Sequence, residues 1–267
     1  MKQIRRVPRP HPYRGQRGFS LIELVVAMVV AVFLLAGLFT VLQGNMDTSS
    51  EQSSLALLQD NERLAMQMLT NVIESAGYFP TVAAGQTGVN VLDTALGVDG
   101  SLAAGQAVTA SPNTSGGDTI MARYQTNPND GVSSCLGRTN TTTGTQIFKN
   151  ILQVDTTQNA LTCSDGNGVT AVPIVGGITN LTILLGVNTQ ATVTNANCPA
   201  NTYVTTTQYA TLTAVQQTNV CTVQVTLTFV NPLYQPIPGA PHTPGQPQTV
   251  QFIKVIAIMA KTGPQVT

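Results

Sequence analysis

Charged residues are scarce in this chain of 267 residues: only 9% are Asp, Glu, Lys or Arg, where a typical soluble domain has about 25%. Tryptophan is absent, and aromatic residues make up only 5%. Hydrophobic residues nevertheless reach 42%, which excludes a long disordered chain because such chains are rich in charge and poor in apolar residues. The length suffices for one or two domains with a real core. Because 12 basic residues balance 12 acidic ones, the total charge argues against a nucleic-acid-binding protein.

Acidic residues are absent from positions 1–18, which hold half of the basic ones. These basic residues are Lys2, Arg5, Arg6, Arg9, Arg14 and Arg17. Without them the chain would keep six basic residues (12 − 6) against 12 acidic ones, and it would be net negative. A basic start before an apolar run is typical of a targeting segment. The alternative, a nucleic-acid-binding arm, lacks the expected aromatic interleaving and recognition helix.

Residues 24–42 contain no charge over 19 positions. As a helix this run would be ~28 Å long, about the thickness of one hydrocarbon core. The basic residues upstream predict a cytoplasmic N-terminus and an exported remainder. A cleaved secretory signal has a similar profile, but this run is longer than a usual signal core and no small-x-small site follows it.

Glu23 stands immediately before the apolar run. An acidic residue at the centre of a membrane helix costs roughly 2.5–3.5 kcal/mol on insertion scales, and less near an end. A single-span anchor has no need of such a residue. Its position alone is also compatible with a side chain that snorkels to the membrane interface.

The sequence GFSLIEL at residues 18–24 resembles the type IV prepilin signature. The resemblance implies that the prepilin peptidase cleaves after Gly18 on the cytoplasmic face and N-methylates Phe19. Residues 1–18 would then be a cleaved leader, and the apolar helix would stay on the mature protein.

Physical chemistry agrees with this interpretation. Cleavage would create an ammonium group at Phe19, and Glu23 lies about one helical turn away on roughly the same face. In a filament core the carboxylate and the ammonium of neighbouring subunits would neutralise each other, which fixes register more than it adds stability. We therefore interpret Glu23 as an assembly residue.

The chain remains helical in pattern after residue 43. Apolar residues at positions 58, 65, 69, 72 and 76 form one stripe, and Gly77 and Pro80 predict the helix end. We expect one helix from Phe19 to about Ala76, ~87 Å long. Residues 19–43 would be its transmembrane or filament-core half, and residues 44–79 its amphipathic half.

Residues 80–267 are predicted to form an exported β-rich domain. We expect strands at 118–124, 147–154, 171–175, 181–187, 220–230 and 250–259, after a loop-rich connection at 81–117. Six prolines at 231–247 predict a stiff loop between the last two strands, and partner binding by this loop is the alternative. The predicted fold class is α+β, with a long N-terminal helix packed on an antiparallel sheet, as in type IV pilins.

Several segments of the exported part resemble the PilW family of minor pilins. They are the stretches GDTI and RY at 117–124, the run PIVGGITNL at 173–181 with GVN at 186–188, and the alternating strand at 220–230. The helix end at 61–78 looks like that of many minor pilins and pseudopilins. The resemblance implies a minor pilin that helps to initiate a type IV pilus or forms part of its tip complex. Its implied partners are other minor and major pilins, the prepilin peptidase, the inner-membrane assembly platform and a tip adhesin. It implies residence in a bacterial inner membrane with a periplasmic domain, and then in the pilus at the cell surface.

Four cysteines, Cys135, Cys163, Cys198 and Cys221, lie in the exported part with separations of 28, 35 and 23 residues. They form no C-x-x-C motif, so zinc or thioredoxin-like chemistry is not expected. Two disulfides are the natural interpretation in an oxidising compartment. Three connectivities exist, and we favour Cys135–Cys163 with Cys198–Cys221 because each pair would join the ends of a polar, turn-rich excursion.

No catalytic site is predicted. His11 lies in the leader and His242 in the proline-rich loop, and one exported histidine does not support a two-histidine metal site or a nucleophilic triad. No phosphate-binding or dinucleotide motif is present, so we expect no enzyme activity, metal or cofactor. Two other functions stay open: a minor pseudopilin of a type II secretion system, and a membrane-tethered periplasmic binding domain that never polymerises.

Overall fold

The structure is a computed structural model that describes residues 18, 20–80, 100, 102–113, 116–166, 170–190, 198–234 and 246–262. The chain divides into two compact units, Met1–Gln52 and Ser53–Thr267. The long helix α1 spans Leu21–Glu74, 54 residues, and supplies residues to both. The described residues do not include most of the predicted leader or Phe19. They also leave out 81–99 and 235–245, which belong to the two predicted loops.

The carbonyl oxygen of Ser20 accepts the first backbone hydrogen bonds of α1. This oxygen accepts hydrogen bonds from the backbone N–H groups of Glu23 (3.0 Å) and Leu24 (3.2 Å). Both the predicted start and the predicted end of the helix agree with the structure to within about two residues, the usual uncertainty of a helix boundary.

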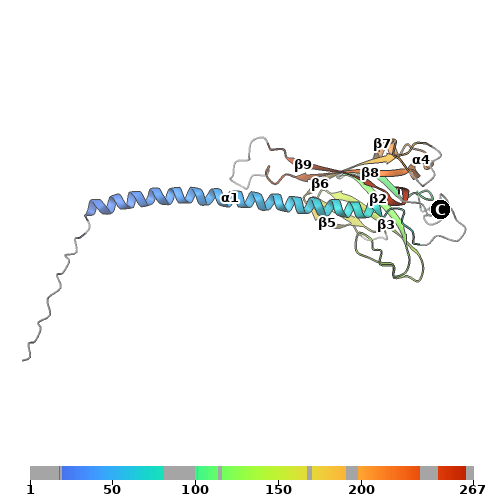
Figure 1. Ribbon diagram of the computed structural model, residues 1–267, viewed down its shortest axis with the longest axis horizontal. Coiled ribbons are helices and arrows are strands. Elements are labelled where there is room, and N and C mark those ends of the chain that lie inside the picture. The colour runs from blue at the N-terminus through green and yellow to red at the C-terminus, as the bar shows by residue number, and fades with distance from the viewer. Residues whose placement is uncertain are drawn as a thin grey trace, which may run out of the picture. The chain divides into compact units, whose positions relative to one another are not determined.

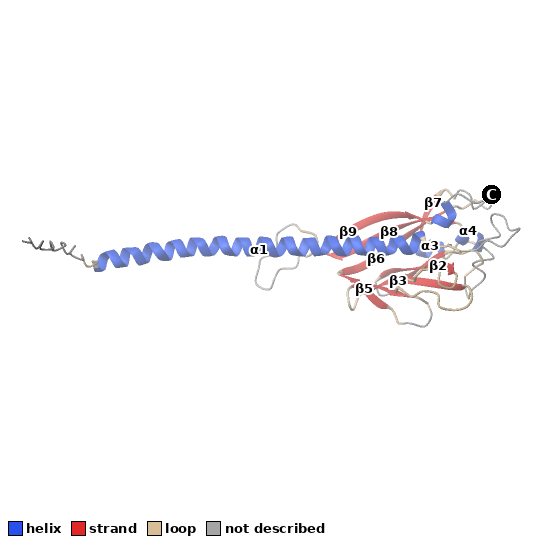
Figure 2. Cartoon of the chain, turned by 60° about the horizontal axis from the view of Figure 1, so that its bottom comes forward, coloured by secondary structure: helices blue, strands red, loops and turns tan. Residues whose placement is uncertain are grey.

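The second unit begins with the C-terminal part of α1, which lies against a sheet (Figure 2). The buried residues of this part are Ala65, Met66, Leu69, Val72 and Ile73. Leu69 and Val72 belong to the predicted apolar stripe, and Leu58 is only partly buried. The stripe is wider than predicted because Met66 and Ile73 also face the sheet.

The helix ends at a glycine, as predicted. Gly77 has a φ of +81°, a conformation that glycine adopts without steric cost. Its N–H donates to the carbonyl oxygen of Arg123 (2.9 Å), and the N–H of Gln125 donates to the carbonyl oxygen of Tyr78 (2.8 Å). The end of α1 is therefore hydrogen-bonded to the sheet.

Within the ranges that the structure describes, nine strands form one sheet with the order β5-β4-β3-β2-β6-β8-β9, in which β1 also pairs with β2 and β7 with β6 (Figure 1). Their bounds are β1 Val108–Asn113, β2 Gly117–Thr126, β3 Gln146–Asp155, β4 Ala160–Ser164, β5 Val172–Gly176, β6 Ile178–Val187, β7 Thr202–Thr205, β8 Val220–Val230 and β9 Thr249–Ala257. The described residues of this unit also form the short helices α3 Thr206–Tyr209, α4 Ala214–Thr218 and α5 Met259–Thr262.

The predicted fold class, a long helix packed on a mostly antiparallel sheet, is confirmed, and the described sheet contains one parallel contact. Strands β2 and β6 run parallel and meet at Gly117 and Leu181. Gly117 has a φ of +92°, and a Cβ atom there would collide with the carbonyl oxygen of Leu181 and the side chain of Asn180. A glycine is therefore required for the two strands to approach so closely.

The prediction of a loop-rich connection at 81–117 is wrong for Val108–Asn113. This segment forms β1 and pairs with β2 over six residues. Its small and polar side chains carry a weak strand signal, and its backbone pairing with β2 determines its structure instead.

Two disulfides join the cysteines in the sequential pairing that the sequence favoured. Cys135 pairs with Cys163 (Cα–Cα 6.4 Å), and Cys198 pairs with Cys221 (Cα–Cα 5.5 Å). The first bridge links the excursion between β2 and β3 to β4, and the second links the segment before β7 to the start of β8.

Candidate assembly helix

The N-terminal part of α1 exposes an extensive apolar surface. Of its residues, Phe33 is 75% exposed, Leu34 69% and Phe39 61%. The core helix of a soluble protein would be mostly buried, whereas the most apolar window of α1 is 0% buried. Within the part of the chain that the structure describes, α1 is the one helix long and apolar enough to cross a membrane. Its surface needs lipid or other helices to cover it.

The one hydroxyl group of the run at 24–42 is satisfied within the helix. Thr40 Oγ1 donates to the carbonyl oxygen of Gly37 (2.8 Å), one turn earlier. The backbone groups of an α-helix are likewise bonded internally. The run can therefore be transferred to an apolar environment without leaving a polar group unpaired.

Glu23 lies in the first turn of α1 and is exposed. A carboxylate at this position is favoured by the positive end of the helix dipole. Among the residues that the structure describes, no cation lies within ion-pair distance of Glu23. Gly18 is exposed and precedes the helix. Because Phe19 lies outside the described residues, its predicted pairing with Glu23 stays a prediction.

Residues 13–39 match the family model of the prokaryotic N-terminal methylation motif. The methylation motif thus includes Gly18, Phe19, Glu23 and most of the apolar run, the residues on which the sequence analysis placed processing and assembly. It covers about a tenth of the chain, and it supports membrane anchoring through the apolar helix.

The other comparisons add little. A search of curated proteins found no match. A solved structure, a type IV-like pilin from Thermus thermophilus, aligns with 77% of this chain and 98% of its own, at a TM-score of 0.38 and 14% identity. At these values the alignment supports no conclusion about function.

In the second unit, two tyrosines have raised pKa values, and both are buried in the fold, where their hydroxyl groups are hydrogen-bonded. Burial raises the pKa of Tyr209, whose hydroxyl accepts from Gln106 Nε2 (2.9 Å) and lies 3.0 Å from the carbonyl oxygen of Gln217. Burial also raises the pKa of Tyr124, whose hydroxyl donates to the carbonyl oxygen of Ser133 (2.7 Å). Among the described residues, no three His, Cys, Asp or Glu side chains come together as a candidate metal site.

Sequence reasoning missed the buried polar network beside α3. The Arg123 side chain, 1% exposed, donates to the carbonyl oxygens of Ala103 and Gln106. Tyr209 joins this network through Gln106. A sequence signal did exist for the two helices near it: Thr205 with Gln208, and Thr213 with Gln216, each form a capping box.

Proposed function

We propose that this protein is a minor pilin, which takes part in initiating type IV pilus assembly or forms part of the tip complex with other minor pilins. The observation that carries the proposal is the exposed apolar half of α1, most of which lies within the methylation motif. A protein that keeps such a helix after processing can lie in a membrane and later pack its helix against those of other subunits. The role is structural and involves no catalysis.

The assembly mechanism follows from the chemistry of the N-terminal end of α1. After cleavage behind Gly18, the new ammonium group at Phe19 and the carboxylate of Glu23 would both lie in apolar surroundings. Either charge alone would be costly to desolvate, whereas a pair from neighbouring subunits neutralises itself. The assembly machinery would then extract a chain from the bilayer once its carboxylate has met a neighbouring amine.

The finer assignment rests on the resemblance to the PilW family. The segments at 117–124, 173–181 and 220–230 support it, because they occur in one chain with the prepilin signature and a helix end like that of minor pilins and pseudopilins. On this proposal the partners are other minor and major pilins, the prepilin peptidase, the inner-membrane platform and a tip adhesin. The second unit would be periplasmic before assembly and exposed on the pilus afterwards.

Replacement of Glu23 by valine tests the proposal. The variant Glu23→Val should be cleaved, methylated and inserted normally, but its amount in sheared filaments should fall by at least about tenfold, the effect of ~1.4 kcal/mol. The matched control is Glu51→Val, which removes another exposed acid of α1 outside the motif and should assemble normally. Recovery of Glu23→Val in filaments at the wild-type level would contradict the assembly role of Glu23. Absence of the wild-type protein itself from filaments would favour a tethered domain that does not polymerise.

A further inference from the structure

Among the described residues, strand β9 pairs with β8 alone, so it lies at an edge of the sheet. Natural edge strands are usually blunted by shortness, proline, bulges or several charges. This one is nine residues long and pairs with β8 without a register shift. It contains no proline, and its one charged residue is Lys254. Ile253 and Val255 are 63% and 52% exposed.

The backbone groups that face the open edge can be identified from the ladder. At its two ends, the N–H of Asn231 donates to the carbonyl oxygen of Gln248 (2.9 Å), and the N–H of Ile258 donates to that of Cys221 (3.0 Å). Hydrogen-bonded pairs alternate along an antiparallel ladder. The even-numbered residues of this segment therefore point their backbone groups toward β8, and Gln251, Ile253 and Val255 point theirs outward.

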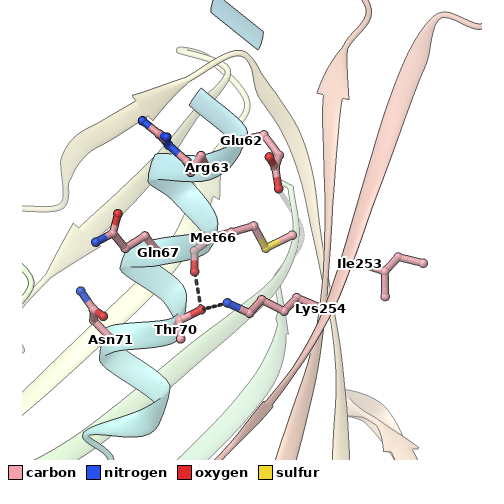
Figure 3. A pocket seen from close by; sticks show the side chains of 8 residues that line it. All are labelled: Glu62, Arg63, Met66, Gln67, Thr70, Asn71, Ile253 and Lys254. Carbon is pink, nitrogen blue, oxygen red and sulfur yellow. Dashed lines mark hydrogen bonds between the residues drawn. The ribbon is translucent and has the colours of Figure 1, made fainter. Parts of the chain in front are cut away.

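A groove of about 360 Å³ lies between β9 and the C-terminal part of α1 (Figure 3). Lys254 Nζ crosses it and donates to Thr70 Oγ1 (2.8 Å). At the opposite edge of the sheet, α1 contacts β5 directly, since Asn61 Nδ2 donates to the carbonyl oxygen of Gly176 (3.3 Å). One hydrogen bond therefore joins α1 to β5 and another joins it to β9, and the groove lies beside the second.

The groove carries a net positive charge. Its charged lining residues are Arg63 and Lys254 against Glu62. Lys254 lies on the groove side of β9, whereas Ile253 and Val255 project from the alternate positions. A strand added to β9 would place every second side chain next to Lys254 and the others beside the two apolar residues.

We propose that the β9 edge binds an extended segment of a partner protein by strand addition. The partner segment carries acidic residues at the positions that face Lys254 and Arg63, and apolar residues at the positions beside Ile253 and Val255. Main-chain hydrogen bonds supply affinity, and the alternate side chains supply specificity. A second copy does not meet this requirement with its own described edge strands, because β1, β5, β7 and β9 contain no acidic residue.

This surface is distinct from the apolar half of α1, so the inference does not rest on the proposed pilin function. Loss of assembly in Glu23→Val with intact binding at β9 would support both. Normal filaments with no binding at β9 would contradict this inference alone.

Binding of a labelled peptide to the full chain in detergent micelles tests the inference. The probe is a short blocked peptide of alternating valine and glutamate, followed by fluorescence anisotropy, with a second peptide in which lysine replaces glutamate. The Ile253→Pro variant removes one outward N–H and keeps the bonds to β8, because proline is tolerated where its nitrogen faces the open side of an edge strand. Its affinity for the glutamate peptide should fall about tenfold, and the control Ile253→Val should bind like the wild type.

Reversal of the charge at position 254 tests the predicted preference for an acidic partner segment. Lys254→Glu should weaken binding of the glutamate peptide and make the lysine peptide the better ligand. Near-UV circular dichroism of each variant shows that the second unit is still folded. Equal binding of both peptides to the wild type would overturn the inference, as would unchanged binding by Ile253→Pro. Formation of disulfide-linked dimers by Ile253→Cys at the same protein concentration would overturn it too, because it would make a second copy the occupant.

Discussion

The backbone N–H of Gly77 donates to the carbonyl oxygen of Arg123 at 2.9 Å, and this bond joins the end of the long helix to strand β2. The side chain of the same arginine is buried and binds the carbonyl oxygens of Ala103 and Gln106. One residue of β2 therefore holds both the helix end and the segment that leads into β1.

Replacement of this arginine should destabilise the second unit. Arg123→Met leaves the carbonyl oxygens of Ala103 and Gln106 without their guanidinium donor, and a buried unpaired group costs about 1–3 kcal/mol. We expect a total loss of about 2–4 kcal/mol in the free energy of unfolding. Urea unfolding of the full chain in micelles, followed by the near-UV signal of the tyrosines, measures it. The exposed Arg63→Met is the control, and an equal loss there would contradict the explanation.

In the C-terminal part of α1, the stability lost on replacing a leucine by alanine should depend strongly on how deeply that leucine is buried. Leu69 is 0% exposed, so Leu69→Ala should cost about 2–5 kcal/mol by leaving a cavity. Leu64 is 45% exposed, and Leu64→Ala should change stability much less. The same urea experiment compares the two. Similar losses for both would mean that the helix does not pack on the sheet through the observed face.

The sequence predicted the features that depend on local pattern. The alternation of Val223, Val225 and Leu227 fixed β8 with its observed bounds, and Gly77 fixed the end of α1. The polar, turn-rich excursions between cysteines favoured the sequential pairing that the structure shows.

Features that depend on distant partners were missed. Strand β4 has only five residues and no alternation, because four of the five are buried. Strand β7 has four residues and is held by β6. The parallel contact at Gly117 depends on Leu181, far along the chain. In the candidate site, the position of Glu23 in the first turn of α1 could be predicted, and its pairing with the Phe19 amine of a neighbouring subunit stays a prediction.

Each disulfide should stabilise the second unit. Cys135 and Cys163 close a loop of 28 residues, and in the chain-entropy model such a bridge contributes about 3–4 kcal/mol. The double variant Cys135→Ala/Cys163→Ala should lose stability of this order while Cys198–Cys221 still forms. Peptide mapping under non-reducing conditions checks the bridges. Detection of a peptide that joins Cys163 to Cys198 in the wild type would contradict the structure.

Alkaline pH should unfold the second unit through its buried tyrosines. Burial raises the pKa of Tyr124 and Tyr209 above the usual value of 10.0, so the folded chain binds these protons more tightly than the unfolded chain. Their contribution to stability is complete below pH 10 and is lost as the pH rises through the folded-state values. Unfolding free energies measured from pH 8 upward should therefore be level at first and fall above pH 10. A rise in that range would contradict the burial of the two hydroxyl groups.

We propose that the apolar half of α1 remains on the mature protein after processing and packs against the helices of other subunits. The direct measurement is the mass of the N-terminal peptide of the protein purified from its native membrane. We expect a chain that begins at Phe19, carries one methyl group on its amino nitrogen and retains the whole apolar run. A mature chain that begins downstream of residue 42, or one that keeps residues 1–18, would contradict it.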